Sequence, residues 1–446
     1  MRTRATPAAD PAFPKRPPTT RARTPRWLAQ AVLGAVFLAA LAGGLRAVWR
    51  EDPDAVWSQA QAQLKGGRID EAERLAKRLA RLRKPKVVDL FLQAQVAIAR
   101  QRDDQALEVL ARIPRDHVLA PQAHLMAGQI ELRRNRLRFA ERSFLQAIEL
   151  DPRLVAAHRE LIYIYGYQLR RRELGRAFER LAGLTDLTFD NAFLWCLLRS
   201  AVWDAGTVIL DLSRFLEADP EDRWTRLALA ENYCRTGLRD EARTVLEPLP
   251  LSDPDALALR VMLALDQQQL EEARRLLDSG PADHPVLARL RGRLALAEHD
   301  NHAAARHFRV ALAGDPDNRD AILGLINALT RLHDDEAAAP LRRVAEDLDR
   351  LNTLIQRAAT PYERNNPRLL RDLGAACARL GRFPEARAWY QLAIAQDPLD
   401  TESQQALFRI PAPAPPLSPR AAESSTKPPP DTPNFGFVRA PRGPAE

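Results

Sequence analysis

The chain has 446 residues, of which 46% are hydrophobic and 28% charged, a composition typical of globular proteins that excludes a short peptide and a wholly disordered chain. The net charge of +8 is unevenly distributed: residues 1–50 hold nine basic side chains and one acidic side chain, whereas residues 51–408 hold 52 basic and 54 acidic ones. The long central part is therefore close to neutral, which argues against nucleic acid as a partner.

The first segments predict a membrane anchor. Residues 1–26 are rich in Pro, Thr and Arg, so we expect a disordered basic leader. Within residues 27–49, the nineteen residues from Trp27 to Leu45 contain Gln30 as the only strongly polar side chain. A helix of that length spans about 28 Å, close to the roughly 30 Å hydrocarbon core of a bilayer. We therefore expect one transmembrane helix.

The charges on either side of this segment predict its orientation. Seven basic residues precede the apolar run, and three acidic residues follow it within a few positions. By the positive-inside rule, the N-terminus lies in the cytoplasm and the remainder lies across the membrane, in the periplasm if the source is a Gram-negative bacterium. A cleaved signal peptide is the alternative, because Ala40-Leu41-Ala42 has the small-x-small pattern of a cleavage site.

A repeat with a period near 34 residues runs through residues 53–405. Two small residues twelve positions apart, followed by a proline after twelve more, occur as Gly128/Ala140/Pro152, Ala230/Ala242/Pro254, Gly292/Ala304/Pro316 and Gly374/Ala386/Pro398. Looser copies are Cys196/Val208/Pro220 and Val261/Ala273/Pro285, while Ala60/Ala72 and Ala94/Ala106 keep only the first interval. A large apolar residue follows the second small residue by four positions, as at Phe144, Leu246, Phe308 and Tyr390.

This spacing predicts pairs of antiparallel helices. Small residues let the two helices of a pair approach closely, and the bulky side chain one turn later fills the space between them. The proline ends the second helix because it has no backbone N–H to donate. One pair cannot cover its own apolar face, so neighbouring pairs must stack into a solenoid.

These residues resemble the tetratricopeptide repeat family. In the best copy, residues 373–398, nearly every signature position matches except Cys377, where the family prefers Tyr. The resemblance implies an all-α, right-handed superhelical solenoid of about nine or ten helix-turn-helix repeats. We expect irregular geometry at 166–190, where three residues are inserted near Arg170-Arg171-Arg172, and at 343–366.

The resemblance also implies a concave groove lined by the first helix of each repeat, where a protein or peptide partner binds. Aromatic and Arg side chains are enriched among interface hot spots. The register places these candidate partner-binding residues on the groove: Arg159, Tyr163, Phe193, Glu231, Arg235, Arg289, Arg293, Arg371 and Arg379. The alternative is that each is an ordinary exposed helix residue. The family's carboxylate clamp is disfavoured, because Leu323 stands where a basic partner of Asn327 is needed.

The sequence contains no motif for catalysis or for cofactor binding. Phosphate-binding loops, dinucleotide fingerprints, zinc-protease motifs and nucleophile elbows are all missing. His299, His302 and His307 are spaced closely but lack further ligands, so we expect solvated histidines and no metal site. Cys196 and Cys377 occupy packing positions and should be buried as small apolar residues. We expect neither catalysis nor a cofactor.

Residues 409–446 are rich in proline and predict a disordered tail. Together these features predict a single-pass membrane protein whose repeats act as a protein-interaction scaffold or assembly factor. The alternative is a repeat subunit that recruits substrate for an envelope enzyme complex, such as a glycosyltransferase system. The partner and the oligomeric state are not encoded in a recognisable motif.

Overall fold

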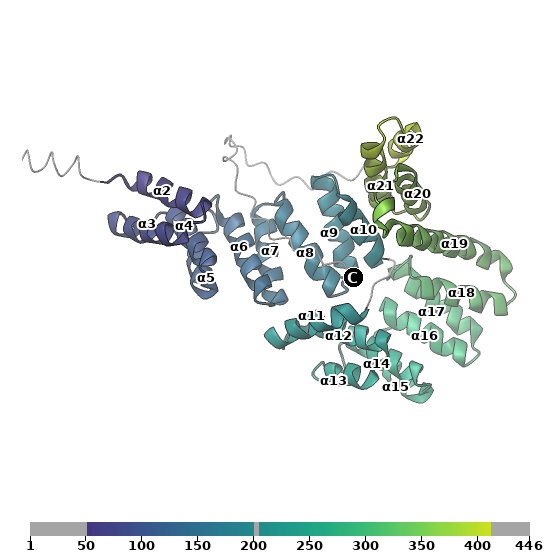
Figure 1. Cartoon of the computed structure of the whole chain (residues 1–446). Helices are drawn as coiled ribbons and strands as arrows, with labels where there is room; N and C mark the ends of the chain where they lie inside the picture. The colour runs from purple at the N-terminus through teal and green to yellow at the C-terminus, as the bar shows by residue number, and fades with distance from the viewer. Residues whose placement is uncertain (1–50, 200–204, 412–446) are drawn as a thin grey trace, which may run out of the picture. The chain divides into compact units, whose positions relative to one another are not determined.

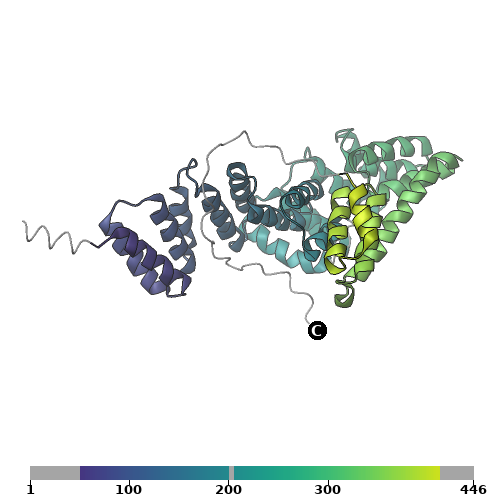
Figure 2. The same ribbon diagram turned by 90° about the horizontal axis from the view of Figure 1, so that it is seen from above.

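The computed structural model describes residues 51–199 and 205–411, so the segments predicted as leader (1–26), transmembrane helix (27–49) and nearly all of the tail (409–446) lie outside the described residues. The described ranges contain twenty-one α-helices, one short 3-10 helix and no strand (Figure 1 and Figure 2). The prediction of an all-α solenoid is confirmed. None of the helices in these ranges has the length and apolar character needed to cross a bilayer.

The chain divides into two compact units, Met1–Pro85 and Lys86–Glu446. In the first unit, α2 (Pro53–Lys65) and α3 (Ile69–Leu82) pack against each other. Ala60 and Ala72, the small residues of the repeat pattern, are fully buried. The N-terminus of α2 is capped by the carboxylate of Asp52, which accepts a hydrogen bond from the backbone N–H of Asp54.

The second unit consists of helical pairs in sequence. Its helices are α4 (Val87–Ala99), α5 (Asp103–Ala111), α6 (Ala120–Arg133), α7 (Leu137–Leu150), α8 (Val155–Tyr167), α9 (Arg171–Leu184), α10 (Phe189–Arg199), α11 (Ala205–Ala218), α12 (Arg223–Thr236), α13 (Arg239–Leu246), α14 (Pro254–Asp266), α15 (Leu270–Asp278), α16 (Pro285–Ala297), α17 (Asn301–Gly314), α18 (Arg319–Arg331), α19 (Asp335–Ala358), η1 (Pro361–Glu363), α20 (Pro367–Arg379), α21 (Phe383–Gln396) and α22 (Thr401–Arg409).

The predicted packing inside the pairs is present. A Cβ atom added to Gly128 of α6 would lie 2.6 Å from Cδ1 of Phe144 on α7, and Phe144 is fully buried. A Cβ on Gly374 would lie 2.8 Å from Cε1 of Tyr390 in the same way. Only glycine lets the first helix approach the ring this closely, since normal carbon contacts lie beyond about 3.5 Å.

Two of the repeat prolines do not end a second helix, which corrects the sequence interpretation. Pro254 and Pro285 are instead the first residues of α14 and α16. Proline is favoured at this position because its fixed φ suits the helix and its missing N–H would have no intrahelical acceptor. At α14 the preceding residue, Asp253, caps the helix by accepting hydrogen bonds from the N–H groups of residues 255 and 256.

The segment 343–366, which the sequence predicts to interrupt the repeats, is mostly helical. Most of it belongs to α19, a continuous helix of 24 residues, and the short helix η1 then leads to α20. Leu348, Leu351 and Ile355 give α19 a buried face along its second half. The second helix of this repeat is therefore extended.

Helix α10 packs against segments far away in the sequence. Besides its neighbour α9, it contacts α19 and α21, and α9 also contacts α21 (Figure 1). Buried residues from both segments share one core, which includes Trp195 of α10 and Trp389 of α21. We call this set of contacts, between α9–α10 and α19–α21, the closure. It adds long-range contacts to a fold in which repeats normally touch only their neighbours.

Candidate binding surface

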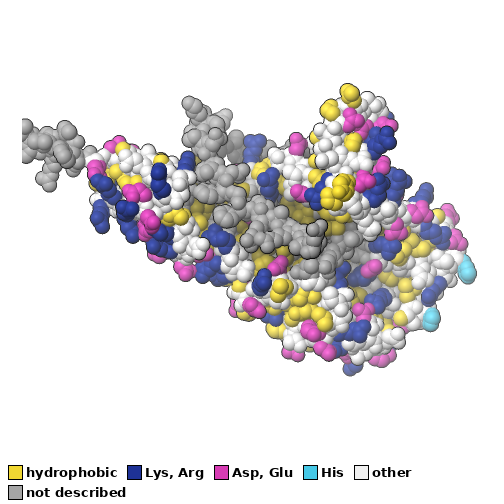
Figure 3. Space-filling view, viewed as in Figure 1, with side chains coloured by type: hydrophobic (Ala, Val, Ile, Leu, Met, Phe, Trp, Pro, Cys, Tyr) yellow, Lys and Arg dark blue, Asp and Glu magenta, His cyan; other side chains and the backbone are white. Residues whose placement is uncertain are grey.

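All nine predicted partner-binding residues lie on first helices of the repeats. Arg159 and Tyr163 are on α8, Phe193 on α10, Glu231 and Arg235 on α12, Arg289 and Arg293 on α16, and Arg371 and Arg379 on α20. Figure 3 shows Lys and Arg side chains interspersed with Asp and Glu over the face in view. Partner binding by these nine residues stays a prediction, and their surroundings differ from one to the next.

Several of the predicted cations form ion pairs between neighbouring repeats. Arg289 Nη1 on α16 lies 3.2 Å from a carboxylate oxygen of Asp320 on α18. Arg293 Nη2 lies 2.7 Å from Asp266 at the end of α14. These two arginines therefore link three successive first helices. Burial lowers the pKa of Arg289, and its Nε, which is buried, has no hydrogen-bond partner within the described part of the chain.

The arginines of α20 are paired in a similar way. Arg371 Nη1 lies 3.0 Å from Asp400, the residue that caps α22, and 3.1 Å from Glu402. Burial alone would raise the pKa of Asp400, but hydrogen bonds from Ser403 and Arg371 outweigh it, so the pKa is lowered. These contacts hold α22 against α20.

Helix α9 reaches α12 and α17 through Arg171 and Arg172. Glu231 of α12 lies between Arg171 Nη2, at 3.0 Å, and Arg235 Nη2, at 3.1 Å. Burial raises the pKa of Glu231, but the two guanidinium groups more than offset this and lower it. Arg172 donates a hydrogen bond of 3.3 Å to the backbone carbonyl of Gly314. The predicted groove residues Glu231 and Arg235 are thus part of an internal connection.

Arg170, the residue before α9, is held more tightly. Its side chain is 9% exposed and donates to Glu141 of α7 at 2.8 Å. The guanidinium group also lies 4.5 Å from the ring centroid of Tyr165 and 4.6 Å from that of Trp224. Residues 170–172 therefore connect α9 to α7, α12 and α17.

The prediction of three inserted residues near 170–172 is wrong: residues 168–170 join α8 to α9 just as residues 134–136 join α6 to α7, and Leu169 has a positive φ as Asn135 does. The sequence pattern did not indicate the partners of these arginines.

Arg159 and Tyr163 have different surroundings from the paired arginines. Arg159 is exposed, and no ion-pair partner for it is found in residues 51–199 and 205–411. Tyr163, one turn later on α8, is 38% exposed. Its ring centroid lies 4.8 Å from that of Tyr167, whose hydroxyl donates to Asp211 of α11 at 3.2 Å. Partial burial raises the pKa of Tyr163, so its hydroxyl is neutral and can donate a hydrogen bond.

A supporting layer lies behind this pair. Tyr167 packs edge-on against Phe215 of α11, with 5.5 Å between the ring centroids. Next to Arg159 on α8, Glu160 accepts a hydrogen bond of 3.1 Å from Gln129 of α6. Burial raises the pKa of Glu160. The exposed Arg159 and Tyr163 therefore stand on a helix fixed by α6 and α11.

Phe193 of α10 lies near the closure. Its ring stacks on Phe189 with a centroid distance of 5.7 Å, and Phe189 meets Trp389 of α21 edge-on at the same distance. The half-buried Phe193 thus extends a packed aromatic row.

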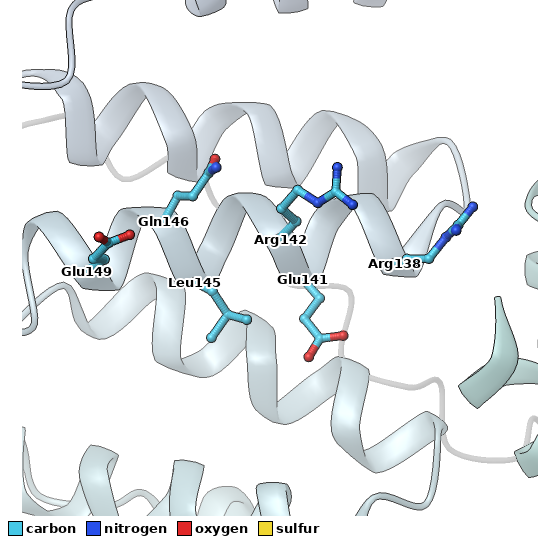
Figure 4. A pocket seen from close by; sticks show the side chains of 6 residues that line it. All are labelled: Arg138, Glu141, Arg142, Leu145, Gln146 and Glu149. Atoms are coloured by element: carbon cyan, nitrogen blue, oxygen red, sulfur yellow. The ribbon is translucent and has the colours of Figure 1, made fainter. Parts of the chain in front are cut away.

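A shallow hollow of about 360 Å³ runs along α7 (Figure 4). Its lining is Arg138, Glu141, Arg142, Leu145, Gln146 and Glu149, all from this one helix. Three of the charges are already paired: Arg138 with Asp219 at 2.8 Å, Glu141 with Arg170 at 2.8 Å and Glu149 with Arg115 at 3.1 Å. The hollow therefore offers no converging set of polar groups of the kind that holds a small molecule.

One group of possible metal ligands is present in the described ranges, formed by Cys196, Cys377 and Glu385. Their ligand atoms lie within 4.8 Å of one another and all three residues are buried. The Glu385 carboxylate is 3.3 Å from Arg199 and 3.8 Å from Arg382. Because guanidinium groups already neutralise this carboxylate, the group is a poor match for a cation.

Family comparisons agree with the helical pairs. Three segments of the chain, residues 53–78, 209–262 and 367–400, match models of the tetratricopeptide repeat. These segments are tetratricopeptide repeats. The match at 53–78 lies on α2 and α3, and the match at 367–400 covers α20 and α21.

One curated relative is cellulose synthase operon protein C of Xanthomonas axonopodis pv. citri, which is 28% identical over 215 residues. The match covers 45% of this chain but only 14% of that relative. Among solved structures, the Cut9–Hcn1 hetero-tetramer of APC/C aligns over 80% of this chain and 90% of its own, with 13% identity and a TM-score of 0.36. A tetratricopeptide repeat protein from Parabacteroides merdae aligns over 55% and 98%, with 17% identity and a TM-score of 0.29.

Proposed function

We propose that the chain is a non-catalytic scaffold that binds a protein partner through the face of α8 that carries Arg159 and Tyr163. The observation that supports this surface is the contrast in surroundings: Arg159 and Tyr163 are exposed, while Arg289, Arg293 and Arg371 are engaged in ion pairs between helices. A partner that bound the paired arginines would have to displace internal carboxylates. Arg159 requires no such exchange.

The chemistry of this surface favours one kind of partner. An exposed guanidinium group recognises a carboxylate, and a tyrosine ring beside it offers an apolar face with a polar end. We propose that the partner presents an acidic residue close to an apolar or aromatic one, on a helix or an extended segment. Tyr and Arg side chains of this kind are over-represented among binding hot spots.

The test measures capture of the partner that co-purifies with the full chain. Replacing both Arg159 and Tyr163 by Ala should weaken binding by about thirtyfold, or about 2 kcal/mol, while helicity and the unfolding midpoint stay near those of the parent. A matched control replaces Arg176 and Tyr362, an exposed arginine and a 97% exposed tyrosine elsewhere in the second unit. If the control weakens capture as much as the double variant does, the α8 surface is not the site.

We also propose that residues 27–49 anchor the scaffold in a membrane, with the N-terminus in the cytoplasm and the repeats outside it. This proposal depends on the apolar run and on the excess of basic residues before it. A reporter active only outside the cytoplasm, fused after residue 408, should give a signal. Activity from a cytoplasmic reporter at the same position would contradict this orientation. Loss of residues 1–42 from the mature chain would indicate a cleaved signal peptide.

A second candidate is a repeat subunit of an envelope enzyme complex, such as a glycosyltransferase system. The similarity to cellulose synthase operon protein C favours this candidate. If it holds, the partner captured through Arg159 and Tyr163 is a subunit of a polysaccharide-synthesising enzyme. If the captured protein has no such role, the general scaffold proposal stands without it.

A further inference from the structure

Two of the three cysteines meet inside the closure. Cys196 of α10 and Cys377 of α20 are both fully buried, and their Sγ atoms lie 3.8 Å apart although the residues are separated by 181 positions in the sequence. All three cysteines of the chain are free thiols, and the third, Cys234 of α12, is half-buried. In the repeat pattern Cys196 occupies the position of Gly374, three residues before Cys377, so the two cysteines are not at equivalent positions, and only the closure brings them together.

The surroundings of the pair are both apolar and charged. Trp389 of α21 donates its indole N–H to Cys196 Sγ at 3.2 Å. Arg199, one turn after Cys196 on α10, pairs with Asp317 at 2.5 Å and with Glu385 at 3.3 Å. Arg382, which is 3% exposed, lies 3.0 Å from the same Asp317. The guanidinium groups of Arg199 and Arg382 balance the carboxylates of Asp317 and Glu385, so the charges around the two thiols sum to zero.

A metal ion does not fit this centre well. Closed structural zinc sites use four protein ligands, whereas this group has three, and one of them is the carboxylate neutralised by Arg199 and Arg382. Within the described ranges neither sulfur atom has an ion-pair partner: the two contact each other, and Cys196 Sγ accepts the indole N–H of Trp389. Their contact therefore points to the reaction of two thiols with each other.

We propose that Cys196 and Cys377 form a disulfide that fastens α10 to α20, when the chain folds in an oxidising compartment. The bond needs the sulfur atoms to approach to about 2.05 Å. This is a movement of less than 2 Å from their present separation, and rotation of the two side chains about χ1 supplies part of it. The location outside the cytoplasm is part of the proposed function, but the reactivity of the thiol pair is independent of it.

The oxidant is a second disulfide, on an exchange enzyme or on oxidised glutathione. The thiolate of one cysteine attacks a sulfur of that disulfide, which releases one thiol of the oxidant and leaves a mixed disulfide. The thiolate of the other cysteine then attacks the protein-side sulfur and releases the second thiol. Two electrons pass to the oxidant, and the two protons lost by the cysteines appear on its thiols.

Burial determines when this exchange takes place. Neither sulfur is accessible once the closure has formed, since both residues have no exposed surface. Exchange must therefore begin while α10 and α20 are apart, and the second step follows as they meet. After closure the bond is shielded from reducing thiols, which is typical of structural disulfides.

The test uses the full chain, unfolded and refolded in detergent in a glutathione buffer. Free thiols are then alkylated in denaturant, so that buried thiols also react, and the unreduced chain is digested for mass spectrometry. We expect a linked peptide pair containing Cys196 and Cys377, lighter by two hydrogens than the two reduced peptides, and alkylation of Cys234 alone. The oxidised chain should unfold at a higher denaturant concentration than the reduced one. Cys234→Ser should keep this difference, while Cys196→Ser and Cys377→Ser should each abolish it.

Three results would overturn the proposal. The first is alkylation of all three cysteines after equilibration in the oxidising buffer. The second is a linkage that includes Cys234. The third is one equivalent of zinc bound to the reduced chain and lost in Cys196→Ser but not in Cys234→Ser, which would make the centre a metal site. A chain that shows the Cys196–Cys377 bond after refolding but not when isolated from cells would contradict the proposed location and leave the thiol chemistry in place.

Discussion

The close approach of paired helices can be tested at Gly128. Replacing it by Ala adds one methyl group to α6, and that carbon would lie 2.6 Å from Cδ1 and 2.8 Å from Cζ of Phe144. Cε1 of the same ring would lie closer still. Contacts become ordinary only at about 3.4 Å, so the ring or the helix must move by roughly 1 Å. Phe144 is fully buried, so its ring has no open space to enter.

Two opposing terms determine the magnitude. Overpacking a well-filled core by one carbon costs about 1–3 kcal/mol. Replacing a glycine inside a helix by alanine gains about 0.5–1 kcal/mol, because the unfolded chain loses conformational freedom. We therefore expect Gly128→Ala to lower the free energy of unfolding by about 1 kcal/mol, measured from the denaturant midpoint by circular dichroism.

Gly175 provides the matched control, because it lies inside α9 and a Cβ there would meet nothing within 4 Å. Gly175→Ala should raise the unfolding midpoint by an amount equivalent to about 0.5–1 kcal/mol. Adding Phe144→Leu to Gly128→Ala should relieve the overlap, so the two changes should be less than additive. If Gly128→Ala stabilises the chain as Gly175→Ala does, the helices of this pair are not in the contact described.

Three further perturbations test the supporting contacts. Arg170→Ala should cost about 3–5 kcal/mol in urea denaturation, because it leaves the Glu141 carboxylate partly buried without its partner. Arg176→Ala on the exposed side of α9 should cost under about 0.5 kcal/mol, and equal effects of the two changes would refute the structural role of Arg170. Burial lowers the pKa of His158 in the folded chain, so the unfolded chain binds more protons below about pH 6.5, and stability should fall as the pH drops from about 7 to 5. His158→Gln should flatten this dependence in unfolding midpoints measured across that range, and an unchanged slope would contradict the prediction. Asp253→Ala removes the cap of α14 and should lower the thermal midpoint by the equivalent of about 1–2 kcal/mol.

The local architecture could be predicted from the sequence because its causes are local. A small residue must face a bulky one across each pair, and this requirement repeats with a fixed spacing that Gly128 and Phe144 illustrate. The prolines were less informative. Proline suits both the turn after a helix and the first position of the next one, so Pro254 could not be assigned to either from the repeat spacing alone.

The long-range contacts could not be predicted, since repeat spacing describes only neighbouring repeats. The pattern correctly indicated that Cys196 is buried, but its neighbours Cys377 and Trp389 come from a single repeat almost 200 positions later. For the candidate surface, the register placed Arg289 on a first helix and gave no sign of Asp320 beside it. A sequence shows where charges lie along a helix, whereas ion pairs between helices depend on how successive repeats are rotated.

The closure also bears on how the α8 surface could bind. In an open array each repeat contacts only its neighbours, so a binding face can flex with the solenoid. Here α8 shares one core with α10, α11 and α21, and Tyr167 ties it to α11 through both Phe215 and Asp211. Binding to a face held in this way loses less conformational entropy, and preorganisation of that kind increases affinity without any added contact. A bond between Cys196 and Cys377 would act on the same core, so the oxidised chain should hold Arg159 and Tyr163 in a narrower range of positions than the reduced chain.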